Sequence, residues 1–128
     1  MGELDDLEAR DLREAREALE QNIQTIHDRD ADAYLALYDD SPSLIVASAD
    51  SVARGYAPFA AARRSSLDWP DTLVVSEPTV EWIAPGVVWV AFPYVAVLQG
   101  DTARGVSERL FVKTRDGWRI RVTGLMEQ

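Results

Sequence analysis

The sequence predicts a single α+β domain in which helices cover one face of an antiparallel sheet. The N-terminal part of the chain carries apolar residues at helical spacing, whereas the second half is a series of strand-like segments separated by Gly and Pro turns. The chain has 128 residues, of which 47% are hydrophobic and 27% charged, as in a soluble globular protein. We therefore expect one domain spanning residues 1–128.

Three helices are predicted. The longest covers residues 3–27, where the apolar positions recur at helical spacing without an interrupting Gly or Pro: Leu4, Leu7, Leu12, Ala15, Leu19, Ile23 and Ile26. Asp30 is a good N-cap for a second, short helix over Ala31–Tyr38, which should end before Pro42. A third helix is predicted over Tyr56–Ser66, with Pro58 in its first turn.

The strands are predicted from β-branched content and turn residues, at Ser43–Ala49, Val52–Gly55, Thr72–Ile83, Val87–Leu98, Ala103–Thr114 and Trp118–Met126. In this order two helices precede two strands, and a meander follows the third helix. That order lacks the alternation of helix and strand that builds a parallel sheet, so we expect antiparallel pairing.

The last hairpin is predicted to have a three-residue loop, with Gly117 in a left-handed bulge and Thr114 opposite Trp118. This register places Glu108 on the same face as Leu110 and Val112. A carboxylate on an apolar face is costly without a partner. Glu108 is therefore either a pocket acid with a raised pKa or a residue near the rim of the sheet that meets water or an arginine.

The segment Val87–Leu98 carries no charge and is apolar on both faces. One face can pack under the helices, and the other must also be covered if it is not to form a large exposed patch. The simplest cover is a second copy of the same sheet, so we expect a homodimer; the alternative is that the helices and C-terminal tail cover both faces of one chain. Pro93 lacks an N–H and should mark a bulge or an unpaired position.

The composition argues against several classes of function. The formal net charge is −9, concentrated near the N-terminus, and an acidic surface repels phosphate, so we expect no nucleic-acid partner. The chain has no cysteine and a single histidine, His27, so we expect no metal site. It also lacks a glycine-rich phosphate loop, so we expect no cofactor. No apolar stretch is long enough to span a membrane, and the acidic start is unlike a secretory signal, so we expect a cytoplasmic protein.

Three segments resemble SnoaL-like and DUF4440-type proteins of the NTF2-like superfamily: Arg29–Asp40, Gly55 followed by a helix with Phe59, and the closing Lys113–Ile120. The resemblance covers nearly the whole chain. It implies a cone-shaped barrel whose curved antiparallel sheet and N-terminal helices enclose a pocket, usually in a dimer formed through the sheet. Relatives range from ketosteroid-isomerase-like enzymes, polyketide cyclases and epoxide hydrolases to non-catalytic binding or assembly domains.

Two departures from that family affect the expected chemistry. Many relatives carry histidine in the last strand, where this chain has Arg121–Gly124, and the isomerases place a base aspartate near the first strand, where this chain has Val46–Ser48.

The first hypothesis for the function is a homodimer that binds a small, largely apolar molecule with one polar group. Its site would be walled by aromatic residues and oriented by Glu108; the aromatic residues are Tyr34, Tyr38, Trp82, Trp89 and Tyr94.

Two alternatives remain open. The first is a cofactor-independent isomerase, cyclase or hydratase in which Glu108 is the general acid–base and a tyrosine hydroxyl holds an oxyanion. The second is a dimerisation or assembly module whose interior is filled by its own side chains.

Overall fold

The structure, a computed structural model, describes residues 2–66 and 68–128. It contains three helices at the predicted places: α1 (Glu3–Asp28), α2 (Ala31–Leu35) and α3 (Tyr56–Ser65). Asp30 caps α2, since its carboxylate accepts a hydrogen bond from the Ala33 N–H at 3.1 Å. The second helix is shorter than predicted because the chain after it turns and Tyr38 bridges to Ile120 in the last strand.

The sheet has seven strands: β1 (Ile45–Ala47), β2 (Val52–Arg54), β3 (Thr72–Val75), β4 (Thr79–Ala84), β5 (Val87–Leu98), β6 (Asp101–Thr114) and β7 (Gly117–Glu127). The strand order is β2-β1-β7-β6-β5-β3, and β4 also pairs with β5. All pairs are antiparallel except β1 with β7. The expectation of a wholly antiparallel sheet is therefore wrong at this one ladder, where β7 lies beside β1 and runs in the same direction.

The predicted strand Thr72–Ile83 is divided into β3 and β4, which pair with different parts of β5. Pro93 lies at the gap between these two ladders. Its carbonyl accepts a hydrogen bond from the Ser76 N–H at 3.0 Å, so its missing N–H faces the interrupted edge. Pro93 pairs with Val106 of β6 on its other edge, so the predicted unpaired position is confirmed at the edge toward β3 and β4.

The predicted register of the last hairpin is wrong next to the turn, although Leu110 does lie opposite Val122 as that register requires. Thr114 pairs with Gly117, which leaves a two-residue turn, and the bulge lies instead opposite the step from Leu110 to Phe111. Along β6 the buried side chains are consequently Ser107, Arg109 and Phe111, and Glu108 is exposed on the opposite face. Glu108 shares a face with Leu110, as predicted, but that face lies away from α1, because Trp118 and Ile120 share the buried face of Phe111.

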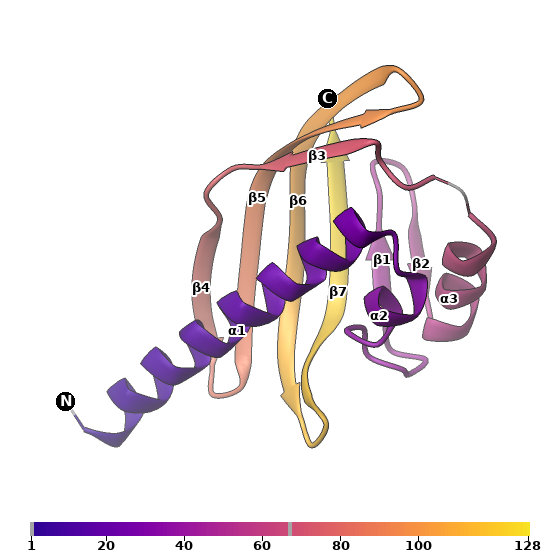
Figure 1. Cartoon of the computed structure of the whole chain (residues 1–128). Helices are drawn as coiled ribbons and strands as arrows, with labels where there is room; N and C mark the ends of the chain where they lie inside the picture. The colour runs from indigo at the N-terminus through magenta and orange to yellow at the C-terminus, as the bar shows by residue number, and fades with distance from the viewer. Residues whose placement is uncertain (1, 67) are drawn as a thin grey trace.

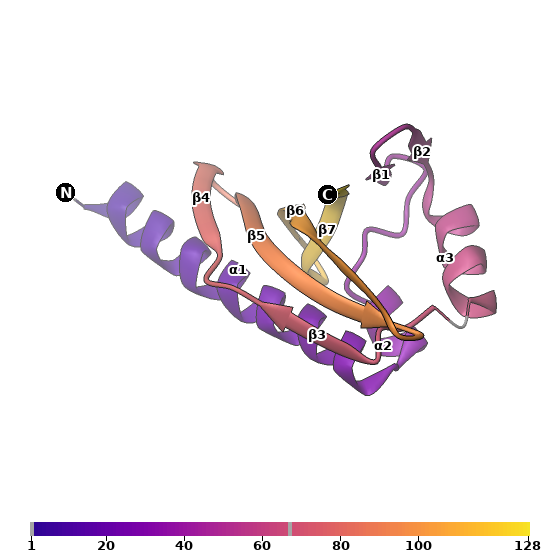
Figure 2. The same ribbon diagram turned by 90° about the horizontal axis from the view of Figure 1, so that it is seen from above.

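Helix α1 runs diagonally across one face of the sheet, and α2 and α3 lie toward the edge formed by β1 and β2 (Figure 1). The sheet is curved but not closed into a barrel, as the view from above shows (Figure 2). The core between α1 and the sheet is built from inward-facing side chains of α1, β5, β6 and β7, with Ala15, Leu19, Val88, Val90, Phe92, Phe111, Trp118 and Ile120 among them.

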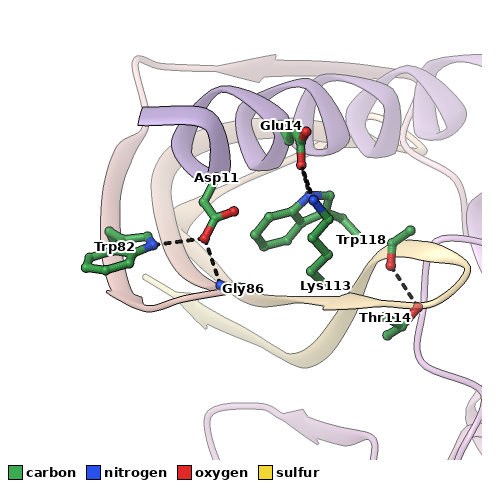
Figure 3. A network of polar contacts seen from close by, with 8 residues as sticks. Asp11, Glu14, Trp82, Gly86, Lys113, Thr114 and Trp118 are labelled. Carbon is green, nitrogen blue, oxygen red and sulfur yellow. Dashed lines mark hydrogen bonds and ion pairs between the residues drawn. The ribbon is translucent and has the colours of Figure 1, made fainter. Parts of the chain in front are cut away.

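The N-terminal half of α1 is fastened to the sheet by two carboxylates that accept indole hydrogen bonds (Figure 3). Oδ2 of the fully buried Asp11 accepts from Trp82 Nε1 at 3.0 Å and from the Gly86 N–H at 2.7 Å, while its Oδ1 has no hydrogen-bond partner in the described part of the chain. One turn later, Glu14 Oε1 accepts from Trp118 Nε1 at 2.8 Å and from Lys113 Nζ at 3.0 Å. These bonds position the rest of α1 over the far end of the sheet.

Candidate functional site

A cavity of about 200 Å³ lies between the C-terminal half of α1 and the inner face of the sheet. Helices α2 and α3, strand β3 and the segment before β3 complete its walls. Most of the lining is apolar, and the lining residues are Ile23, Ile26, Tyr34, Arg63, Trp69, Pro70, Leu73, Phe92, Tyr94, Ala96, Ser107, Arg109 and Leu125. An apolar hollow with a few polar groups is the usual form of a small-molecule site.

The most deeply buried charge in the cavity wall is Arg109 on β6, whose exposed fraction is 6%. Its Nε donates to Oδ1 of Asn22, a fully buried residue of α1, at 2.7 Å, and its Nη1 donates to Ser107 Oγ at 2.5 Å. Ser107 in turn donates to the Gly124 carbonyl at 3.2 Å. The guanidinium carbon lies 5.1 Å from the ring centroid of Phe92. Neutral groups thus hold the guanidinium in place.

A second guanidinium, that of Arg63 on α3, also faces the cavity. Its carbon lies 4.2 Å from the ring centroid of Trp69, which is a cation–π contact. Its Nε and Nη2 are buried and have no hydrogen-bond partner among the described residues. Trp69 also meets the Tyr34 ring edge-on at 5.5 Å, and both arginines line the same cavity as these two rings.

Two tyrosines contribute hydroxyls near this surface. The Tyr38 hydroxyl donates to the Tyr34 oxygen at 2.8 Å, which leaves the Tyr34 proton available as a donor. Burial raises the pKa of Tyr34 well above its ordinary value of 10.0, so this phenol stays neutral. Burial, and then the negative charge of Glu127, raise the pKa of Tyr94, whose hydroxyl has no partner among the described residues.

The structure separates the residues that the sequence suggested for the site. Tyr34 and Tyr94 line the cavity, and Tyr38 lies behind Tyr34. Trp82 is at the other end of α1, bonded to Asp11, and Trp89 is half-buried on the outer face of the sheet. Glu108 is exposed on that outer face, against Gly124.

Sequence reasoning missed Arg63, Arg109 and Asn22. Asn22 continues the buried face of α1, seven residues after Ala15 and three after Leu19, so a polar residue in an apolar stripe was visible as a signal. Arg109 and Phe111 lie on the face of β6 opposite Glu108, whereas the sequence placed the apolar face on the Glu108 side. Nothing in the local pattern around Arg63 distinguishes it from its exposed neighbour Arg64.

Solved structures with the same arrangement of helices and sheet are numerous. An NTF-2 like protein of unknown function from Shewanella oneidensis superposes with a TM-score of 0.80 at 19% identity, covering 89% of this chain and 97% of that one. A protein of unknown function of the DUF3225 family from Pectobacterium atrosepticum gives a TM-score of 0.81 at 15% identity, covering 94% and 92%. The protein has an NTF2-like fold. This confirms the predicted fold class.

The NTF2-like fold alone does not specify a function. A candidate ketosteroid isomerase from Parabacteroides distasonis is also similar, with a TM-score of 0.67 at 16% identity over 83% of this chain and 85% of that one. No protein-family model matches the sequence, and a comparison with curated protein sequences finds no match. Within residues 2–66 and 68–128, no helix is long and apolar enough to cross a membrane, and no group of three acidic or histidine side chains could hold a metal.

Proposed function

We propose that this chain is a SnoaL-like, DUF4440-type member of the NTF2-like superfamily that binds a small, largely apolar molecule, as a homodimer. The observation that carries the binding proposal is the cavity of about 200 Å³ under α1, walled mainly by aromatic and aliphatic side chains. A cavity of ~150 Å³ accommodates benzene, so this one suits a single ring with a short substituent.

The polar groups of the cavity favour binding over general acid–base catalysis. Its described lining residues include no carboxylate and no histidine. Glu108, the acid that an isomerase, cyclase or hydratase would use, lies on the other face of the sheet. We therefore expect Glu108→Gln to leave ligand binding in the cavity unchanged. The cavity also favours a binding protein over an assembly module with a filled interior.

The binding proposal is tested with a neutral probe, 2-phenylethanol, by amide chemical-shift changes in NMR spectra. Ala96 lines the cavity, and Ala96→Phe should fill part of it and abolish the shifts. Ala61 is exposed on α3, so Ala61→Phe is the matched control and should bind as the parent does. Equal binding by the Ala96→Phe protein would show that the probe does not occupy this cavity.

The homodimer proposal is supported by the outer face of the sheet. Trp89, Leu110 and Val122 lie next to one another across β5, β6 and β7 on that face and remain partly accessible in the single chain. Around them Ile83 and Met126 are exposed by 59% and 70%. A face of this kind, present on every copy, is self-complementary about a two-fold axis.

Light scattering after size-exclusion chromatography tests the homodimer proposal. The parent should have twice the chain mass of 14.2 kDa. Leu110→Lys places a charge in the middle of the outer face and should give single chains, whereas Val52→Lys, at a position 67% exposed on β2, should not. A parent protein that elutes as a single chain at all concentrations contradicts the proposal.

A further inference from the structure

Among residues 2–66 and 68–128, two arginines in the cavity wall have no acidic partner. Arg109 is only 6% exposed, and its hydrogen-bond partners Asn22 and Ser107 are neutral. Arg63 has Trp69 against its face and no hydrogen-bond partner for its buried Nε and Nη2. The ion pairs between described residues do not involve Arg63 or Arg109. Their basic residues are Arg16, Arg29, Arg64, Lys113 and Arg121. The arrangement therefore holds two positive charges without a counter-charge.

The acidic groups near the cavity do not supply that counter-charge. Glu127 follows Leu125 on the inner face of β7 and acts on Tyr94, but it is exposed and pairs with neither guanidinium. Asp71, beside Pro70, is already paired with Arg29 and accepts from the Gln99 N–H at 3.1 Å. Asp32 is paired with Arg64, the neighbour of Arg63.

Burying a charge is costly unless it is paired, and two like charges at one cavity repel each other as well. Stacking on Phe92 and Trp69 and hydrogen bonds to neutral groups reduce this cost but leave N–H groups unused. An anion in the cavity would offset both charges. Guanidinium groups match the planar, two-oxygen geometry of a carboxylate, and the free Tyr34 hydroxyl proton can donate to the same group.

We propose that the molecule bound in the cavity is a small carboxylate with an apolar body, its carboxylate between Arg109 and Arg63 and its body against Phe92, Leu73 and Ile23. This inference rests on the proposed binding function, and it names the chemical class of the ligand. An anion of about ten non-hydrogen atoms, such as an arylacetate, fits the volume, since benzene occupies a cavity of ~150 Å³.

The experiment compares phenylacetate with phenylacetamide, which has nearly the same shape and no charge, by calorimetry or NMR titration at pH 7. Phenylacetate should bind the parent at least about tenfold more tightly, because charge-assisted hydrogen bonds are stronger than neutral ones. The formal net charge of the chain is −9, so its overall field repels the anion. A preference for phenylacetate must therefore come from local positive charge.

Arg63→Gln should remove most of the preference for phenylacetate and leave phenylacetamide binding within about twofold. Arg64→Gln is the matched control: it makes the same change of charge one position along α3, at a side chain 56% exposed and paired with Asp32, and it should keep the preference. Arg109→Gln should abolish the preference, with circular dichroism showing whether the variant is folded. If it is not folded, Arg63→Gln against Arg64→Gln decides the question.

Equal affinity of the parent for both probes would overturn the carboxylate inference and leave the binding proposal standing. A preference that Arg64→Gln reduces as much as Arg63→Gln would also overturn it, because the attraction would then be diffuse. If neither these probes nor 2-phenylethanol binds the parent, the cavity is not a binding site and both proposals fail.

Discussion

The two ends of the layer between α1 and the sheet use their buried polar groups differently. At the N-terminal end, Asp11 and Glu14 accept hydrogen bonds from tryptophans 82 and 118, and these bonds hold the helix on the sheet (Figure 3). At the C-terminal end, Arg109 is held by neutral groups, and Arg63 has unused donors. Hydrogen bonds made within the fold stabilise it, whereas the unpaired guanidinium N–H groups of Arg63 at the cavity are available to a ligand.

The comparison predicts the largest effect on stability at Asp11. Asp11→Ala leaves the Trp82 and Gly86 N–H groups without an acceptor, so two part-buried hydrogen bonds are lost together. The free energy of unfolding should fall by about 3 kcal/mol, measured by urea denaturation at pH 7. Glu8→Ala removes the same charge at an exposed position of α1 and should change it by less than about 0.5 kcal/mol. A loss at Asp11 no larger than at Glu8 would show that α1 is not fastened there.

Glu14 should have an intermediate effect that depends on pH. The hydrogen bond from Trp118, and then that from Lys113, hold the pKa of Glu14 below its ordinary 4.5. A carboxyl whose pKa is lower in the folded state stabilises the fold above its unfolded pKa, and the stabilisation is lost as the pH falls through the folded pKa. Glu14→Gln should therefore lower stability by about 1 kcal/mol at pH 7, and the difference from the parent should shrink below pH 4.5.

Urea denaturation at pH 7 and at several values below 4.5 measures the Glu14 effect. Glu17→Gln, an exposed change on the same helix, is the control and should show no such pH-dependent difference. A Glu14→Gln difference that is constant across this range would mean that the Trp118 contact does not depend on the charge of Glu14.

The smallest effect on stability is expected at the cavity end. Replacing Asn22 with Leu and Arg109 with Met together removes a buried charge and its principal neutral acceptor. Exchange of buried charged networks for apolar side chains of similar volume is often neutral or stabilising. The double variant should unfold within about 1 kcal/mol of the parent, or at higher urea, while phenylacetate binding is lost. A destabilisation as large as that of Asp11→Ala would mean that Arg109 serves the fold.

Much of the architecture was readable in the sequence because it depends on local patterns. The periodicity of residues 3–27 and the cap at Asp30 predicted α1 and the start of α2. The uncharged segment Val87–Leu98 predicted β5 with its bounds, and Pro93 predicted the gap in its pairing. Each of these signals lies within a few residues and follows from backbone geometry or side-chain period.

The site was only partly readable, because it depends on which face of a strand meets the helices. Tyr34 and Tyr94 were expected in the cavity and line it, whereas Glu108 was expected to orient the ligand and lies exposed on the outer face. The position of one bulge in β7 places Trp118 and Ile120 on the face of Phe111 and so makes that face, with Arg109, the buried one.

The sequence by itself determined the α+β class, the helices, the long strands and the excess of negative charge, because spacing and composition carry that information along the chain. Only the tertiary structure decided that Arg109 from β6 and Arg63 from α3 share one apolar cavity without a counter-charge. Pairing register and the burial of a charge are settled by contacts between residues far apart in the chain, and no local pattern encodes them.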